Sequence, residues 1–138
     1  EDEVAIISCG GVSYKRYLAI AEHANKKVSV ITDNDKDPDK IAEANKYNNS
    51  HDSQHIFMDQ TIEGWTWEVC FYRENKKTLD DLIEISPKAK YLFHEEDYGP
   101  VLGKMLNNKA DSAYTMLMAK VEFIVPQYVK DAITWLNK

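Results

Sequence analysis

The chain has 138 residues, of which 43% are hydrophobic and 29% are charged, and its formal net charge at pH 7 is −6. This composition is ordinary for a single globular domain with a sizeable core, and it excludes wholesale disorder. No apolar run is long enough to cross a bilayer, so no membrane partner is expected, and the negative charge argues against a basic patch that grips nucleic acid by itself.

The first sixty residues alternate between strand-like and helix-like patterns. The expected elements are strands over 3–8, 27–32 and 54–59 and helices over 14–25 and 39–47. Ser13 is a plausible N-cap of the first helix, and Pro38 stands just ahead of the second. The order strand, helix, strand, helix, strand is typical of a parallel α/β sheet with crossover helices.

The second half of the chain has a different character. The segment TWEVCFY could form a strand or the first turns of a helix, and helical patterns dominate after Thr78. Helices are expected up to Pro87, over 99–108 and 109–123, and again from Pro126, which suits a first turn. We therefore predict an α/β fold in two parts, with an α/β core over 1–72 and a helical C-terminal part over 73–138.

Four aspartates follow the second expected strand at every other position: Asp33, Asp35, Asp37 and Asp39. Like charges this close repel unless a cation lies among them. Ligands of open parallel sheets bind beyond the carboxyl ends of the strands, and Mg²⁺ uses one or two carboxylates. A metal site at Asp33 and Asp35 competes with a solvated acidic turn, whereas for Asp37 and Asp39 the acidic turn is favoured, with Asp39 capping the next helix.

Two other acidic-loop families resemble parts of this segment. An EF-hand loop that started at Asp33 would need Gly and Glu where the chain has Pro38 and Ala44, which excludes it. A haloacid-dehalogenase-like phosphatase also places D-x-D after a strand, with the first Asp as nucleophile. That family usually has Thr or Val where this chain has Asp37, so a phosphatase remains the runner-up.

The remaining polar and aromatic candidates favour structural roles. His51 and His55 have a spacing that could hold zinc on a helix, but they lie in a polar stretch without a third ligand nearby. The aromatic cluster over 65–72 could stack on bases, although such density is more often core. Trp135 is most simply a packing residue. Cys9 and Cys70 lie in apolar runs and are expected to be buried thiols in a reducing cytosol, so a cytoplasmic location is expected.

Five segments taken together carry a family resemblance. In chain order they are VAIISCGGVSYKRYLAIAE, VSVITDND, TWEVCFY, NNKADSAY and VPQYVKDAITWL. They resemble the Toprim nuclease domain of the ATP-dependent overcoming-lysogenization-defect (OLD) endonucleases, which are related to the nuclease subunit of Gabija defence systems. The resemblance covers nearly the whole chain and implies a Toprim-like, Rossmann-type sheet followed by a helical part.

The resemblance also implies roles for individual residues. Asp33 and Asp35 match the pair that binds Mg²⁺ or Mn²⁺, and Glu68 matches the acidic residue of a Thr-Leu-Glu-like segment, with Trp67 in place of Leu. Lys109 matches a lysine that stabilises charge at the scissile phosphate, although without the resemblance it would be a solvent-facing helix residue. The implied partners are DNA, an ATPase domain of the same parent protein and further copies of the chain.

One departure from the family concerns the start of the domain. Toprim domains begin with a strand and an E-G-x-x-E segment, whereas Glu1 to Glu3 lead directly into what resembles the second strand. No phosphate-binding loop for ATP is present either. We therefore expect a piece of a larger metal-dependent DNA endonuclease in anti-phage defence or DNA processing. The alternatives are a D-x-D phosphatase and a catalytically incomplete Toprim-like interaction module.

Overall fold

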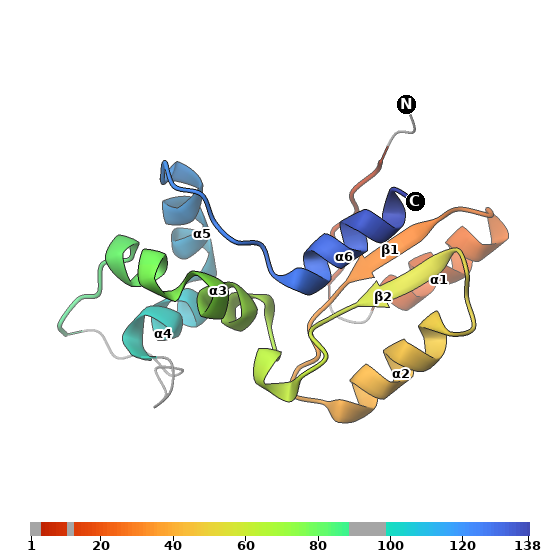
Figure 1. The fold of residues 1–138 in the computed structure, drawn as a ribbon, viewed down its shortest axis with the longest axis horizontal. Coiled ribbons are helices and arrows are strands. Elements are labelled where there is room, and N and C mark those ends of the chain that lie inside the picture. The colour runs from red at the N-terminus through yellow and green to blue at the C-terminus, as the bar shows by residue number, and fades with distance from the viewer. Residues whose placement is uncertain (1–3, 11–12, 89–98) are drawn as a thin grey trace.

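The computed structural model describes residues 4–10, 13–88 and 99–138, and Figure 1 shows two lobes joined near the middle of the molecule. One lobe contains a parallel sheet of two strands, β1 (Val28–Ile31) and β2 (Gln54–Phe57). The register pairs Val28 with Gln54 and Ile31 with Phe57. The predicted α/β class is confirmed, and so are the second and third expected strands.

Helices cover both faces of this sheet. Helices α1 (Tyr14–His23) and α2 (Pro38–Asn48) pack on one face, because Leu18, Ala44 and Ile56 share a buried apolar cluster with Val28 and Val30. Helix α6 (Gln127–Leu136) packs on the other face, where Trp135 stacks on His55. Trp135 is therefore a packing residue, as predicted, and the C-terminal helix returns to the first lobe (Figure 1).

The second lobe consists of helices. After the short 3₁₀ turn η2 (Ile62–Gly64), α3 (Trp67–Leu82) leads to α4 (Gly99–Asn107) and α5 (Lys109–Met118). Val69, Tyr72, Leu79, Leu102 and Met105 form most of its buried core. TWEVCFY therefore belongs to a helix. The predicted boundary between residues 72 and 73 falls inside α3, less than one helical turn before a kink at Asn75.

The aromatic residues between 65 and 72 pack inside this second lobe. Trp67 stacks on Phe71 with 4.6 Å between ring centroids, and Tyr72 is only 1% exposed. Phe123 contacts Phe71 from the segment that precedes α6. The favoured interpretation of these residues as core is therefore confirmed for Trp67, Phe71 and Tyr72.

Several local predictions are wrong. No strand forms over the described residues 4–8, where Ile6 is 94% exposed, because no neighbouring strand pairs with that segment in the described structure. Helix α2 is capped by Asp37 and not by Asp39: the Asp37 carboxylate accepts the backbone N–H of Asp39 at 2.9 Å. At the start of α1, the Ser13 hydroxyl donates to the Gly10 carbonyl and caps no helical N–H.

Two helix ends and the burial of one cysteine also differ from the sequence predictions. Helix α3 ends at Leu82 and α5 at Met118, both earlier than their sequence patterns indicate. Both cysteines are free thiols; Cys70 is buried as predicted, whereas Cys9 is only partly buried. In the described parts of the chain, no helix has the length and apolar character that crossing a membrane requires.

Candidate functional site

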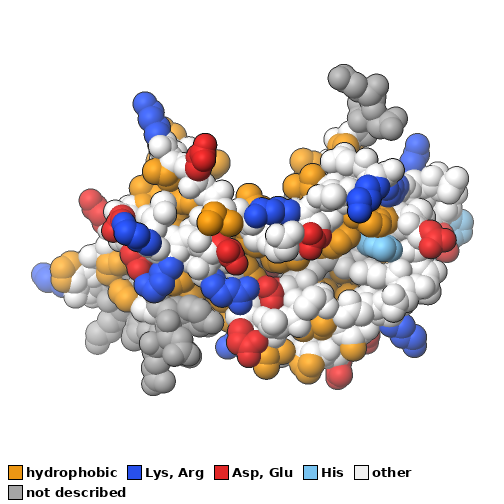
Figure 2. Space-filling view, in the orientation of Figure 1, with side chains coloured by type: hydrophobic (Ala, Val, Ile, Leu, Met, Phe, Trp, Pro, Cys, Tyr) orange, Lys and Arg blue, Asp and Glu red, His pale blue; other side chains and the backbone are white. Residues whose placement is uncertain are grey.

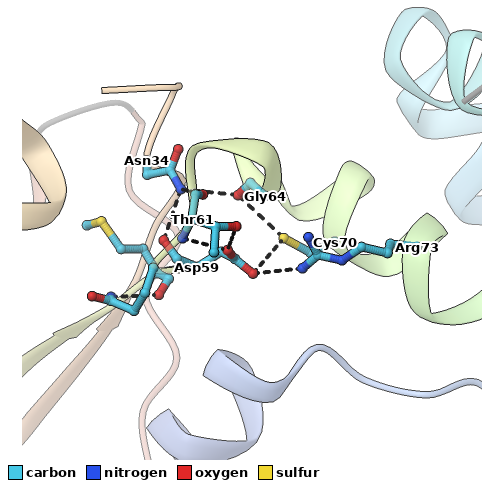
Figure 3. A network of polar contacts seen from close by, with 8 residues as sticks. Asn34, Asp59, Thr61, Gly64, Cys70 and Arg73 are labelled. Atoms are coloured by element: carbon cyan, nitrogen blue, oxygen red, sulfur yellow. Dashed lines mark hydrogen bonds and ion pairs between the residues drawn. The ribbon is translucent and has the colours of Figure 1, made fainter. Parts of the chain in front are cut away.

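The candidate site lies where the two parallel strands end. Asp33 follows β1 after one residue, and Asp59 follows β2 after one residue. The carboxyl ends of neighbouring parallel strands meet at one edge of the sheet, so both loops emerge side by side. Figure 3 shows Asp59 between Asn34, which belongs to the first loop, and Arg73, which belongs to α3.

Asn34 holds the two loops together from a fully buried position. Its side-chain nitrogen lies 2.9 Å from the carbonyl oxygen of Asp59 and 2.8 Å from that of Thr61, to which it donates. Its side-chain oxygen accepts the N–H of Lys36 at 2.9 Å. A buried amide with all these partners satisfied fixes the path of the backbone on both sides.

The backbone next to Asn34 has an unusual conformation. Asp35 and Lys36 have φ angles of 57° and 62°, in the left-handed region that residues other than glycine seldom adopt. The N–H of Asp35 donates to the carbonyl of Trp65 at 3.0 Å, which holds the turn in place. Such strain persists only where the surroundings impose it, and it often occurs at functional sites.

Asp33 is held by the beginning of α3. One carboxylate oxygen accepts the backbone N–H of Trp67 at 2.9 Å, and the other accepts the hydroxyl of Thr66 at 3.1 Å. Thr66 is the N-cap residue of α3 and only 4% exposed. The strand end and the helix start are therefore connected through the Asp33 carboxylate.

Glu68 and Lys109 complete a chain of contacts that begins at Asp33. The Thr66 hydroxyl also contacts Glu68 Oε2, and the Lys109 ammonium lies 2.7 Å from Glu68 Oε1. These residues come from the end of β1, the start of α3 and the start of α5. They are far apart in the sequence, since the first is residue 33 and the last is residue 109. Three of the four predicted site residues (Asp33, Glu68 and Lys109) are thus brought together.

The pKa values of Asp33 and Glu68 are shifted in opposite directions. Burial raises the pKa of Asp33 above its ordinary value, helped by the negative charges of Glu68 and Asp35, although the hydrogen bonds from Trp67 and Thr66 act against it. Burial also acts to raise the pKa of Glu68. There the hydrogen bonds from Lys109 and Thr66 outweigh burial, and the pKa is lowered.

Asp35 lies apart from this chain of contacts. Its carboxylate forms an ion pair with Lys40 of α2 at 2.7 Å, and its side chain is 67% exposed. The negative charge of Asp35 nevertheless contributes, as the smallest of several causes, to the raised pKa of Asp33. Lys40 therefore already supplies a positive charge to the Asp35 carboxylate.

The donor set around Asp33 fits a hard divalent cation. Its half-buried carboxylate has no cationic partner among the described residues, and oxygen ligands suit Mg²⁺ and Mn²⁺. Within those residues, no three His, Cys, Asp or Glu side chains form a ligand group. The residues present therefore suit a cation held by one or two carboxylates and completed by water and phosphate oxygens, and not a closed cage of protein ligands.

The charged surface near the site is mixed. Figure 2 shows Lys and Arg side chains interleaved with Asp and Glu side chains where the two lobes meet. The face drawn there carries no continuous basic patch, which agrees with the net charge of −6. Nucleic acid would have to be held at this face by individual cations and hydrogen bonds and not by a broad positive field.

The zinc hypothesis finds no support in the positions of the two histidines. His51 stacks on Tyr47 and lines a cavity of about 510 Å³ between α1 and α2. His55 lies in β2 and stacks on Trp135 of α6, on the other face of the sheet. None of the four predicted site residues lines this cavity, so it is separate from the candidate site.

Sequence reasoning missed three residues that organise the site: Asn34, Thr66 and Asp59. Asn34 is the middle residue of the D-x-D motif. Its polar side chain between two candidate metal ligands is the feature of the sequence that could have pointed to it. Thr66 had a signal too, because it lies two residues before Glu68. Asp59 closes the third expected strand, at the position that corresponds to Asp33, but its role depends on Arg73, which no pattern connects to it.

Comparison with known proteins gives one finding. Residues 1–35 match the family described as "Overcoming lysogenization defect protein-like, TOPRIM domain", and the matched segment ends with Asp33 and Asp35. The match supports a Toprim domain of this type, which is a nucleotidyl-transfer and nuclease class of domain. No curated protein and no solved structure matches the chain.

Proposed function

We propose that this chain is the metal-binding part of a Toprim nuclease domain that hydrolyses DNA phosphodiester bonds. The observation that carries the proposal is the continuous set of contacts from Asp33 through Thr66 and Glu68 to Lys109. It unites carboxylates, a hydroxyl and an ammonium group from three separate segments at the carboxyl edge of a parallel sheet. The family match over residues 1–35 supports the same class of chemistry.

Each residue has a distinct proposed role. Asp33 and Asp35 would hold Mg²⁺ or Mn²⁺, and in a two-metal scheme one cation would supply an activated water while the other would neutralise charge on the leaving oxygen. The buried Thr66 hydroxyl shares its single proton between the Asp33 and Glu68 carboxylates and so fixes the orientation of both. Glu68, with its lowered pKa, is an ionised carboxylate that can accept a proton or help to hold the cation.

Lys109 carries the proposed contact to the scissile phosphate. Its side chain is 61% exposed while its ammonium group is paired with Glu68, whose side chain is 13% exposed. An ammonium group held at the rim by a buried carboxylate can reach an incoming phosphate oxygen without first being desolvated. Such a group stabilises the negative charge that develops in the transition state.

The partners expected from the resemblance stay predictions. DNA is the proposed substrate, and the ATPase domain of the same parent protein, the homo-oligomer and a role in anti-phage defence or DNA processing are consequences of the same hypothesis. The phosphatase alternative requires Asp33 to act as nucleophile. Both oxygens of Asp33 already accept hydrogen bonds, which lowers their nucleophilicity, so the geometry favours the metal-ligand role.

Metal binding is tested first through stability. A cation that binds the folded state alone raises the unfolding temperature by mass action. Mn²⁺ should stabilise the unsubstituted chain, Asp33→Ala should remove this stabilisation, and Asp39→Ala should retain it, because the Asp39 side chain belongs to the exposed first turn of α2. Equal metal-induced shifts in all three proteins would refute the metal assignment.

Cleavage by the full-length protein then separates the two enzyme classes. Asp33→Asn should abolish nicking of plasmid DNA in Mn²⁺, and the unsubstituted protein should form no phosphoenzyme during the reaction. Trapping a phosphoryl group on Asp33 would establish the phosphatase instead. Metal binding without any cleavage by the unsubstituted full-length protein would support the non-catalytic interaction module.

A further inference from the structure

Helix α6 approaches the candidate site with its first turn. At its far end, Trp135 stacks on His55 at 4.4 Å between ring centroids and lies 4.7 Å from the ammonium of Lys27, which directly precedes β1. Figure 1 shows α6 running antiparallel to both strands, so its N-terminal turn lies at the strand ends, where Asp33 and Asp59 are found.

The backbone just before α6 is fixed to the second lobe. Asn75, at the kink of α3, accepts the N–H of Ile124 at 2.7 Å and donates to its carbonyl at 2.8 Å. This reciprocal pair of hydrogen bonds holds the segment close to α3, the helix whose start carries Thr66 and Glu68. The first turn of α6 is therefore positioned from both lobes.

Tyr128 lies in that first turn, and its hydroxyl is unused by the fold. The side chain is 8% exposed, so nearly all of its surface is buried. Within residues 4–10, 13–88 and 99–138, none forms a hydrogen bond with its hydroxyl. The fully enclosed side-chain polar atoms without a partner in the described residues are Ser29 Oγ and Ser112 Oγ, so the Tyr128 hydroxyl keeps access to solvent and can meet a ligand.

The groups around the phenol are those of the candidate site. Burial, the Cys70 thiol and the negative charges of Asp33, Asp59 and Glu68 all raise the pKa of Tyr128 well above its ordinary value. The phenol is therefore neutral at physiological pH and keeps its O–H. It lies close enough to the carboxylates of Asp33, Asp59 and Glu68 for their charges to act on it, but no hydrogen bond joins it to any of them.

We propose that Tyr128 is a substrate-binding residue of this site, whose hydroxyl donates a hydrogen bond to a non-bridging phosphate oxygen of the DNA strand held beside Asp33 and Glu68. The inference rests on the proposed function and adds a residue to it. A phosphate must approach this acidic edge to be cleaved, and a neutral donor in the helical turn beside the edge can offer it a hydrogen bond. Lys109 and Tyr128 then contact the phosphate from two different helices.

The test is Tyr128→Phe in the full-length protein. This change removes only the hydroxyl, which stabilises nothing in the fold, so the unfolding temperature should stay unchanged. Loss of one hydrogen bond to a charged phosphate should raise KM for DNA cleavage roughly tenfold, with kcat nearly unchanged, because the contact is present in the ground state as well as the transition state. Tyr114→Phe on the exposed side of α5 is the matched control and should change neither constant.

Salt dependence gives a second readout that packing would not alter. A neutral donor releases no counterion, so Tyr128→Phe should weaken DNA binding equally at low and high salt, whereas Lys109→Ala should reduce the salt dependence itself. An unchanged KM, or a lowered unfolding temperature with normal kinetics, would overturn the inference and leave the nuclease proposal intact. Absence of DNA binding and cleavage in the unsubstituted protein would overturn both.

Discussion

Two aspartates at equivalent places in the sheet have opposite environments. Asp59, after β2, accepts the hydroxyl and the N–H of Thr61 and pairs with Arg73 at 2.9 Å. Asp33, after β1, accepts a backbone N–H and a hydroxyl but pairs with no cation among the described residues. The pKa of Asp59 is lowered, because these hydrogen bonds and Arg73 outweigh burial, whereas burial raises the pKa of Asp33.

The difference separates a structural carboxylate from one that is available for a ligand. Both aspartates follow a strand after one residue. The sequence around them does not indicate which of the two carboxylates forms an ion pair with a cationic side chain. Arg73 comes from the second turn of α3 and neutralises Asp59 within the fold. Asp33 keeps a half-buried charge without such a partner among the described residues, which is the situation that a bound divalent cation would relieve.

The largest effect is expected on cleavage, from Lys109→Ala. Removing a group that stabilises transition-state charge should reduce cleavage by the full-length protein about a hundredfold. Metal affinity should not fall, since the change frees Glu68 of its ammonium partner. Stability should change little, because the Lys109 side chain is 61% exposed. Normal cleavage by this variant would show that Lys109 is only a solvent-facing helix residue.

Gly64→Ala should disturb the Asp59 side of the comparison. A Cβ at this position would lie 2.3 Å from Asp59 Cγ, and the carboxylate is held by hydrogen bonds on both of its oxygens. The resulting shift should lower the free energy of unfolding by about 2 to 3 kcal/mol. Urea unfolding measures this change, and a loss below about 0.5 kcal/mol would mean that the Asp59 network tolerates displacement.

Asn substitutions at Asp59 and Asp33 should change stability in opposite directions. Because the pKa of Asp59 is lowered by folding, its ionised carboxylate stabilises the folded state. This stabilisation is complete at pH values above the ordinary pKa and is lost as the pH falls through the pKa of the folded state. Asp59→Asn should therefore cost about 1 to 2 kcal/mol at pH 7, reduced by the 42% exposure of Arg73, and less in acid.

For Asp33 the sign is reversed. Its raised pKa means that ionising Asp33 is less favourable in the folded state than in the unfolded state. The resulting loss of stability is absent below the ordinary pKa of 3.8 and complete above the pKa of the folded state. In EDTA, Asp33→Asn should therefore stabilise the protein at pH 7 and lose this advantage as the pH falls towards 3.8. Urea unfolding at several pH values compares both variants, and parallel pH curves would remove the distinction between the two aspartates.

The smallest effect concerns the other carboxylates of the first loop. Asp37→Ala should destabilise the chain by about 0.5 to 1 kcal/mol, because its carboxylate accepts the N–H groups of Asp39 and Lys40 at the start of α2. Asp39→Ala is the control and should have less effect, since no hydrogen bond accepted by its side chain is found in the described residues. Neither change should affect the thermal shift with Mn²⁺, which would confine the metal role to Asp33 and Asp35.

The sequence by itself determined the alternation of elements and the place of the acidic loop. Period-two and helical patterns are local, so β1, α2 and β2 could be predicted within a few residues. The D-x-D pair at a strand end was equally local, and it pointed to the carboxyl edge of the sheet. The resemblance added Glu68 and Lys109, which no spacing argument could have connected.

Only the tertiary structure decided how these residues meet. The expected strand over 3–8 failed because a strand needs a paired neighbour, and no pattern within one segment can supply one. The pairing of Arg73 with Asp59 and of Lys109 with Glu68 depends on helices α3 and α5, which reach the sheet edge from later parts of the chain. The pairing of Lys40 with Asp35 is local, because the two residues are only five apart. Charges are local in sequence, but their partners are set by packing, and packing therefore decides which carboxylate is left for a cation.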